Sequence, residues 1–216
     1  MAALLTEAEL AEVQAATTGA EARTSGEIVP YLVEQADEHV DGRYRAALLG
    51  AVLAVTVATA LHEGLDLWGP PLVFWMLVPA WLGALIGFLT CRLFPGLLRI
   101  LVPDEILDQR VLRRAEAAFL HEEVFKTRDR TGILVFLALT EHRALILADS
   151  GIHQAVPREQ WQQLASGLAA GIKEGRAKAA LIETIKACGA LLVEHRLDIR
   201  QDDTNELADA PRIHAR

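Results

Sequence analysis

The chain has 216 residues, of which 52% are hydrophobic, and it carries a formal net charge of −8. An acidic chain without a basic stripe argues against a nucleic-acid partner. Its two cysteines, Cys91 and Cys188, are far apart in sequence, which excludes a disulfide framework and a metal-type cysteine spacing. The mean hydropathy is positive, so the location of the excess apolar residues is the first thing to establish.

The N-terminal segment reads as a helix followed by a strand. A capping-box pattern at Thr6 and the apolar spacing after it predict a helix over residues 6–20. Residues 28–33 are typical of a β-strand. Pro30 cannot donate to a ladder, so we expect this strand to lie at a sheet edge or to be bulged. No signal peptide is expected, because this acidic segment lacks a continuous apolar run.

Two uncharged runs follow. Residues 46–61 and 67–91 contain no Asp, Glu, Lys or Arg, and a bilayer core needs about 20 apolar helical residues. We therefore predict two transmembrane helices, over about 45–62 and 67–91, joined as a hairpin that contacts the lipid bilayer. The alternative is a pair of buried helices in a soluble core. Prolines and terminal aromatic residues in the second run favour the membrane.

Small residues recur at fourfold spacing in both runs. They are Gly50, Ala54 and Ala58 in the first run and Gly83 and Gly87 in the second. This spacing allows two helix backbones to approach closely. We expect the two helices to pack on each other or on a second copy in a homo-oligomer.

Basic residues predict the orientation of the hairpin. Arg43 and Arg45 precede the first run, Arg92 and Arg99 follow the second, and the connection 62–66 has no Lys or Arg. Positive residues favour the cytoplasmic side. Both chain termini are therefore expected to be cytoplasmic.

The remaining chain predicts a sheet with helices around it. A helix is expected to start near Pro103, and the apolar runs 132–139 and 144–148 predict an antiparallel hairpin whose first strand is central. Two closing helices are expected, one after Pro157 and one over 179–194. The fold class is thus a small α/β sandwich, a mixed sheet with flanking helices, interrupted by a transmembrane hairpin. The expected parts are residues 1–42 and 93–200 of the α/β domain, the hairpin 43–92 and an acidic tail 201–216.

Several short motifs in this order resemble the TPM domain family, in a bacterial membrane-embedded branch. The motifs are Thr24-Ser25-Gly26-Glu27-Ile28-Val29, Arg130-Thr131-Gly132, Asp149-Ser150-Gly151-Ile152-His153 and Asn205-Glu206-Leu207-Ala208-Asp209. Ser150 and Ala208 depart from the family pattern. The resemblance implies an α/β sandwich in a bacterial inner membrane, phosphatase activity and, for some relatives, divalent metal binding.

Four residues are candidate ligands for Ca²⁺ or Mg²⁺: Asp149, Glu27, Glu141 and His153. Hard cations need several converging oxygen ligands. The alternative interpretation of Asp149 is a turn or helix-capping residue, and that of the others is scattered surface charge. No nucleophile motif or P-loop is present, so no catalytic residue is assigned.

These observations leave two functions open. The first is a membrane-anchored interaction or scaffold module on the cytoplasmic face, which would assist other membrane proteins. The alternative is a weak phosphatase that depends on a divalent metal. A channel or transport role has less support, because the two runs hold no charged residue that marks an ion path.

Overall fold

The computed structural model describes residues 5–37, 40–64, 72–97, 101–153, 155–195, 197 and 205–214. The start of the predicted second span, Arg99 and residues 201–204 and 215–216 of the acidic tail lie outside the described residues. The contacts divide the chain into two units. One combines Met1–Asp37 with Asp108–Arg216, and the other is Glu38–Leu107.

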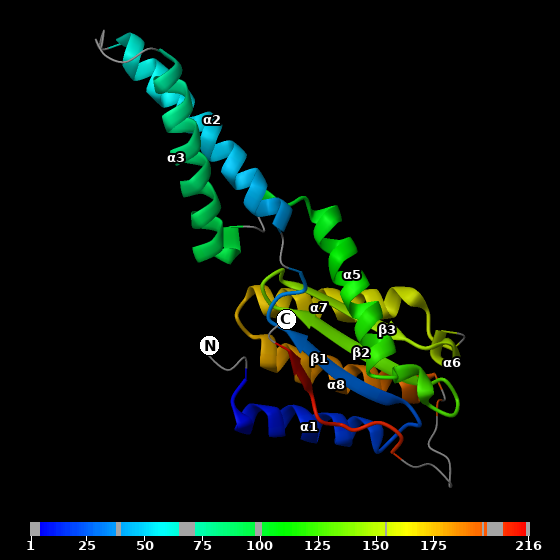
Figure 1. Ribbon diagram of the computed structural model, residues 1–216. Helices are drawn as coiled ribbons and strands as arrows, with labels where there is room; N and C mark the ends of the chain where they lie inside the picture. The colour runs from blue at the N-terminus through cyan, green and yellow to red at the C-terminus, as the bar shows by residue number, and fades with distance from the viewer. Residues whose placement is uncertain are drawn as a thin grey trace. The chain divides into compact units, whose positions relative to one another are not determined.

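The secondary structure follows the chain in this order (Figure 1): α1 Glu7–Glu21, β1 Glu27–Val33, α2 Val40–Gly64, α3 Leu72–Leu93, the 3₁₀ turn η1 Pro95–Leu97, α5 Asp104–His121, the 3₁₀ turn η2 Val124–Lys126, β2 Gly132–Ala138, β3 Arg143–Ala148, α6 Ser150–His153, α7 Arg158–Lys173, α8 Ala177–Glu194 and β4 Arg212–His214.

The first unit is built on a mixed four-stranded sheet in the order β3-β2-β1-β4. β1 pairs in parallel with β2 and β4, and β2 pairs antiparallel with β3. Every residue of β2 is buried, as expected for a strand that is apolar on both faces and lies inside a sheet. The small α/β class, with a mixed sheet and flanking helices, is therefore confirmed.

β1 lies inside the sheet and pairs with β2 in an unbroken register, so the prediction that Pro30 places this strand at an edge or in a bulge is wrong. The amide of Glu27 donates toward β2, whereas the amide of Glu34 donates to His214 of β4. Because amides alternate sides along a strand, the nitrogen of Pro30 faces the β4 side. The β4 ladder begins only at Tyr31, so the proline removes no donor that a ladder needs.

Helices cover both faces of the sheet. On one face, Ile28, Ile133 and Val135 pack with residues of α1, α7 and α8, including Val13, Leu168 and Leu181. On the other face, Leu134 and Phe136 pack with Val111, Ala115 and Ala118 of α5. These two apolar layers give the first unit its core, because each face of β1 and β2 is removed from water.

The C-terminal tail supplies β4, which the sequence analysis did not predict. This strand has only three residues, and none of them is fully buried. The ring of His214 stacks on Tyr31 of β1, with the ring centroids 4.7 Å apart. Arg212 forms an ion pair with Glu122 at 3.1 Å. Contacts with distant residues therefore hold this strand in place.

Candidate functional site

The second unit consists mainly of α2 and α3, and its surface is unusually apolar. Both helices are long and apolar enough to cross a membrane, and only 11% and 6% of their most apolar stretches are buried. Leu53 is 66% exposed and Trp81 is 77% exposed. A core helix of a soluble domain would bury most of these side chains. Exposed apolar surface of this extent marks an interaction with lipid or protein.

Glycines lie at the contact between α2 and α3. A Cβ atom added to Gly50 or to Gly83 would come within 2.2 Å of the carbonyl oxygen of the other residue. A Cβ on Gly87 would come equally close to the carbonyl of Ala46, and the Cβ of Ala54 lies near Gly83. Only residues without side chains fit these positions, so the two backbones touch directly. Ala58 of α2 is also buried.

The four candidate metal ligands lie at two ends of the sheet. Glu27 begins β1, next to the start of β2, and Asp149 follows the end of β3 at the same end. Glu141 lies in the β2–β3 turn at the opposite end, about 20 Å away over the length of a strand. Its carboxylate accepts a hydrogen bond from the amide of Ala36. His153, at the end of α6, is exposed. The structure therefore does not bring the four together.

Asp149 has the environment of a helix-capping residue. It is 6% exposed, and its Oδ1 accepts a hydrogen bond from the amide of Ser150, the first residue of α6, at 2.6 Å. Its Oδ2 lies 3.0 Å from Nε of Arg130. Aspartate is favoured before a helix because it satisfies free amide groups. This environment favours the structural interpretation of Asp149.

Glu27 receives the C-terminal tail. Its two carboxylate oxygens accept hydrogen bonds from the amides of Glu206, at 3.2 Å, and Leu207, at 3.4 Å. The side chain of Glu206 in turn accepts from the amide of Arg128 at 2.8 Å. Burial is the main cause that raises the pKa of Glu27, and these two amides oppose the rise. The motif segments around Glu27, Arg130 and Glu206 therefore meet at one end of the sheet.

Glu21 and Asp209 complete this group, which we call the acidic end: Glu21, Glu27, Glu206 and Asp209. The pKa of Glu21 is raised to about 8, chiefly by burial and also by the nearby carboxylates of Glu27 and Asp209. Glu21 accepts from the amide of Ile28 at 2.7 Å. Asp209 accepts from Thr18 at 2.5 Å and also from Asn205. At neutral pH Glu21 is therefore protonated and suited to share a hydrogen bond with Asp209.

The acidic end has the donor types of a hard-cation site but not the arrangement. No group of three Asp, Glu, His or Cys side chains among the described residues is placed to hold a metal ion. The oxygens of Glu27 and Asp209 already accept hydrogen bonds from the protein. In sequence, Glu27 was recognised as a candidate but Glu21 was missed, because only the fold brings α1 to the start of β1.

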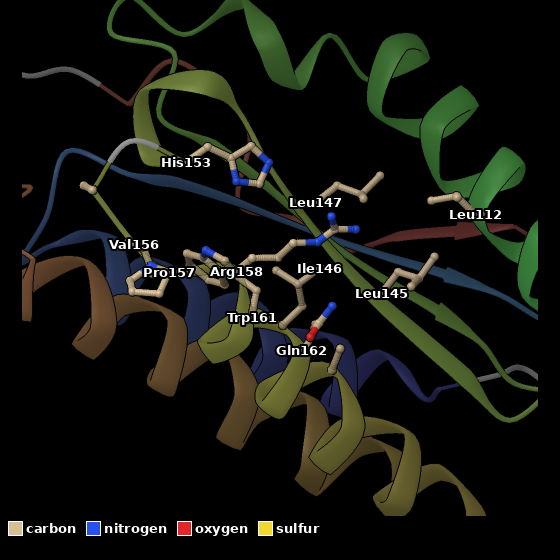
Figure 2. A pocket seen from close by; sticks show the side chains of 12 residues that line it. Leu112, Leu145, Ile146, Leu147, His153, Val156, Pro157, Arg158, Trp161 and Gln162 are labelled. Carbon is tan, nitrogen blue, oxygen red and sulfur yellow. The ribbon is translucent and has the colours of Figure 1, made fainter.

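A groove of about 730 Å³ runs along β3. Three consecutive strand residues, Leu145, Ile146 and Leu147, line it together with Trp161 of α7. His153 and Arg158 also line it, and Figure 2 shows the guanidinium of Arg158 extended along β3. The sequence analysis did not identify this groove. Its only sequence signal is a short strand without a charged residue after Arg143.

The fold defines this chain as a small α/β protein with a mixed four-stranded sheet. The NMR structure of the BA42 protein from the psychrophilic bacterium Bizionia argentinensis has a similar fold, with a TM-score of 0.59 and 17% sequence identity. The similarity covers 99% of this chain and 98% of that chain. No protein-family profile and no curated protein sequence matches this chain. The likeness supports the fold and does not extend to the function.

Proposed function

We propose that this chain is a membrane-anchored interaction or scaffold module of the TPM domain family, on the cytoplasmic face of a bacterial inner membrane. In this proposal α2 and α3 span the bilayer as a hairpin, and the α/β unit binds other membrane proteins. The observation that carries the proposal is the outward-facing apolar surface of α2 and α3. Leu53, Trp81 and Ile86 each leave more than half of the side-chain surface exposed.

The chain connectivity supports a common side for both ends of the hairpin. β1 precedes α2 and β2 follows α3, yet the two strands pair directly over seven residues. Residues before and after the hairpin must therefore fold on the same side of a membrane. The arginines that flank the two apolar runs favour the cytoplasm as that side.

Membrane extraction tests the anchor. The chain should stay in the membrane pellet after an alkaline carbonate wash. A Leu53→Arg, Leu85→Arg variant should move to the supernatant, since each arginine at the centre of a span costs about 2.5–3.5 kcal/mol. The matched control is Leu120→Arg, Val193→Arg, which places two arginines at exposed apolar positions of the α/β unit. Release of the unaltered chain by carbonate would contradict the anchor.

Two further measurements test the side and the role. An alkaline phosphatase fused after Arg216 should be inactive, and a fluorescent protein fused there should be bright. Periplasmic phosphatase activity would overturn the orientation. A detergent pull-down that returned no partner across several conditions would count against the interaction role.

A divalent-metal-dependent phosphatase is the second candidate, and the acidic end is the observation that favours it. Four carboxylates from three chain segments gather there, and two of them have raised pKa values because of burial. The phosphatase ranks second because no three carboxylates among the described residues are placed to bind one metal ion.

Calorimetric titration with Ca²⁺ and Mg²⁺ separates the two candidates. The phosphatase candidate requires heat of binding at millimolar metal, and this heat should be lost in Glu27→Gln. It also requires hydrolysis of a generic phosphate ester. Hydrolysis that survived both Asp149→Asn and Glu27→Gln would remove these residues from the mechanism.

A further inference from the structure

We propose that the groove along β3 binds an extended peptide segment of a partner protein, which adds a strand to the sheet and places a carboxylate against Arg158. This inference rests on the proposed interaction role and names the surface and the chemistry of the partner. The groove takes its lining from β3, His153 of α6, the α6–α7 connection, α7 and Leu112 of α5, so it lies within the first unit.

The groove follows the edge of the strand. Consecutive residues of a strand point to opposite faces of the sheet. Leu145, Ile146 and Leu147 are consecutive, and all three line the groove. A cavity that reaches both faces must open along the edge between them. β3 is the last strand of the sheet order, so this edge has no neighbouring strand among the described residues.

The ladder shows which backbone groups face this edge. The amide of Asp149 donates to the carbonyl of Gly132 at 2.9 Å, and the register pairs Val135 with Ile146. Bonded and non-bonded pairs alternate along an antiparallel ladder. Leu145 and Leu147 therefore bond to β2, whereas Ala144, Ile146 and Ala148 direct their N–H and C=O groups outward. These groups are spaced as a second strand requires.

The edge also lacks the usual protection against strand addition. Natural edge strands carry lysine, proline, inward charges or bulges that prevent pairing. From Ala144 to Ala148 the strand is Ala-Leu-Ile-Leu-Ala, without any of these residues. Apolar side chains on both sides of the edge offer contacts to alternate residues of an added strand. An apolar, extended peptide fits this surface.

The charge of the groove indicates which charge the bound partner segment should carry. His153 and Arg158 are exposed and line the groove, and its described lining contains no Asp or Glu. A guanidinium and an imidazole without a carboxylate in the described lining favour a ligand with carboxylate oxygens. The carboxylate of the proposed ligand is an acidic side chain of the partner segment.

A second copy of this chain fits the groove less well. Two identical edges would pair about a two-fold axis, and residues near the axis would meet their own copies. The guanidinium of Arg158 lies near Ile146 and Leu147 (Figure 2), so a pairing centred on Ile146 would bring two arginines together. Like charges that meet in an interface disfavour it. Charge complementarity therefore points to a different, acidic partner segment.

The probe is an array of synthetic random-sequence peptides that are long enough to cover β3. The full chain in detergent micelles is applied to the array, and bound peptides are titrated by fluorescence anisotropy. Enriched peptides should carry β-branched or aromatic residues at alternate positions and an acidic side chain at one end. An array with no peptide enriched above background would overturn the proposal.

Substitutions at the groove separate edge pairing from charge. Ile146→Pro removes an outward N–H without touching the β2 ladder, and Arg158→Glu reverses the charge. Each should weaken binding of an enriched peptide about tenfold or more. Lys186→Glu, an exposed charge reversal on α8, is the matched control and should leave binding unchanged. Binding that is equal in Arg158→Glu and in the control would overturn the proposal.

N-methylated versions of an enriched peptide test strand addition without altering the protein. This test therefore remains valid even if the Ile146→Pro variant does not fold. Methylation of one set of alternate residues should abolish binding, while methylation of the other set should be tolerated. Equal effects of the two sets would overturn strand addition. A different outcome is that the unaltered chain self-associates at the assay concentration and that Ile146→Pro abolishes this self-association. That result would assign the β3 edge to a second copy and would also overturn the proposal. The carbonate extraction above fails or succeeds independently of these results.

Discussion

The two units of this chain place apolar side chains in opposite ways. In the α/β unit the largest apolar residues are inside, and the whole of β2 is buried between helices. In the α2–α3 unit the large apolar residues point outward, and glycines make the contact between helices. The first arrangement is that of a protein folded in water. The second arrangement is typical of helices in an apolar surrounding, where packing between small residues holds helices together, and it is the one that the proposed membrane anchor requires.

The same leucine truncation in each unit should produce the largest contrast. Leu134 is fully buried in β2, whereas Leu53 of α2 is 66% exposed. We expect Leu134→Ala to lower the free energy of unfolding by about 2–5 kcal/mol. Leu53→Ala should change it by less than about 0.5 kcal/mol. Chemical unfolding of both variants in mild detergent measures the difference.

Equal losses from the two substitutions would mean that the side chain of Leu53 is buried in the working protein. That outcome would contradict the contrast between the two units and favour a protein partner on α2 in place of lipid. A loss of stability only in Leu134→Ala would support the contrast.

Local sequence patterns predicted the elements that depend on the hydrophobicity of consecutive residues. The unbroken apolar run of β2 indicated a central strand, and the short polar connection after it indicated an antiparallel hairpin. Both features are present. β4 could not be predicted, since its residues Arg212–His214 have no strand pattern and depend on Tyr31 and Glu122. Its position is a property of the tertiary fold.

The site was less predictable for the same reason. Glu27 and Asp149 were chosen from motif positions, and the sheet order brings them to one end while it leaves Glu141 at the other. Glu21 looks like an ordinary helix-terminal glutamate in sequence. Its pKa of about 8 results from burial in the folded chain and from the carboxylates of Glu27 and Asp209, which the fold brings close to it.

A methyl group at the helix contact should give the next largest effect. Gly83→Ala would place a Cβ atom 2.2 Å from the carbonyl oxygen of Gly50. The helices must then separate, and we expect a loss of about 1–3 kcal/mol from overpacking. Gly64→Ala, at the end of α2, is the control, because no heavy atom lies within 4 Å of an added Cβ there.

Unfolding by dodecyl sulfate, followed by helical circular dichroism, measures this effect. The Gly83→Ala variant should lose helical structure at a lower detergent fraction than the Gly64→Ala variant. Identical transitions would show that α2 and α3 do not depend on their mutual contact, and that each has another neighbour.

A buried carboxyl group should give a smaller effect that depends on pH. The pKa of Glu21 is about 8 in the folded chain and 4.5 as its ordinary value. The folded state thus retains a proton that the unfolded state loses between these values. The stability contributed by Glu21 is complete below pH 4.5 and is lost as the pH rises through about 8. Glu21→Gln should remove this decline.

The measurement is urea unfolding of the chain at pH 6 and at pH 9. Glu21→Gln keeps an oxygen for the amide of Ile28 and gains an N–H for Asp209, so it should be more stable than the unaltered chain at pH 9 and closer to it at pH 6. Glu116→Gln, an exposed position on α5, is the matched control and should follow the unaltered chain at both pH values. If Glu21→Gln also follows the unaltered chain, Glu21 is ionised at neutral pH, and its burial does not make the stability of the α/β unit depend on pH.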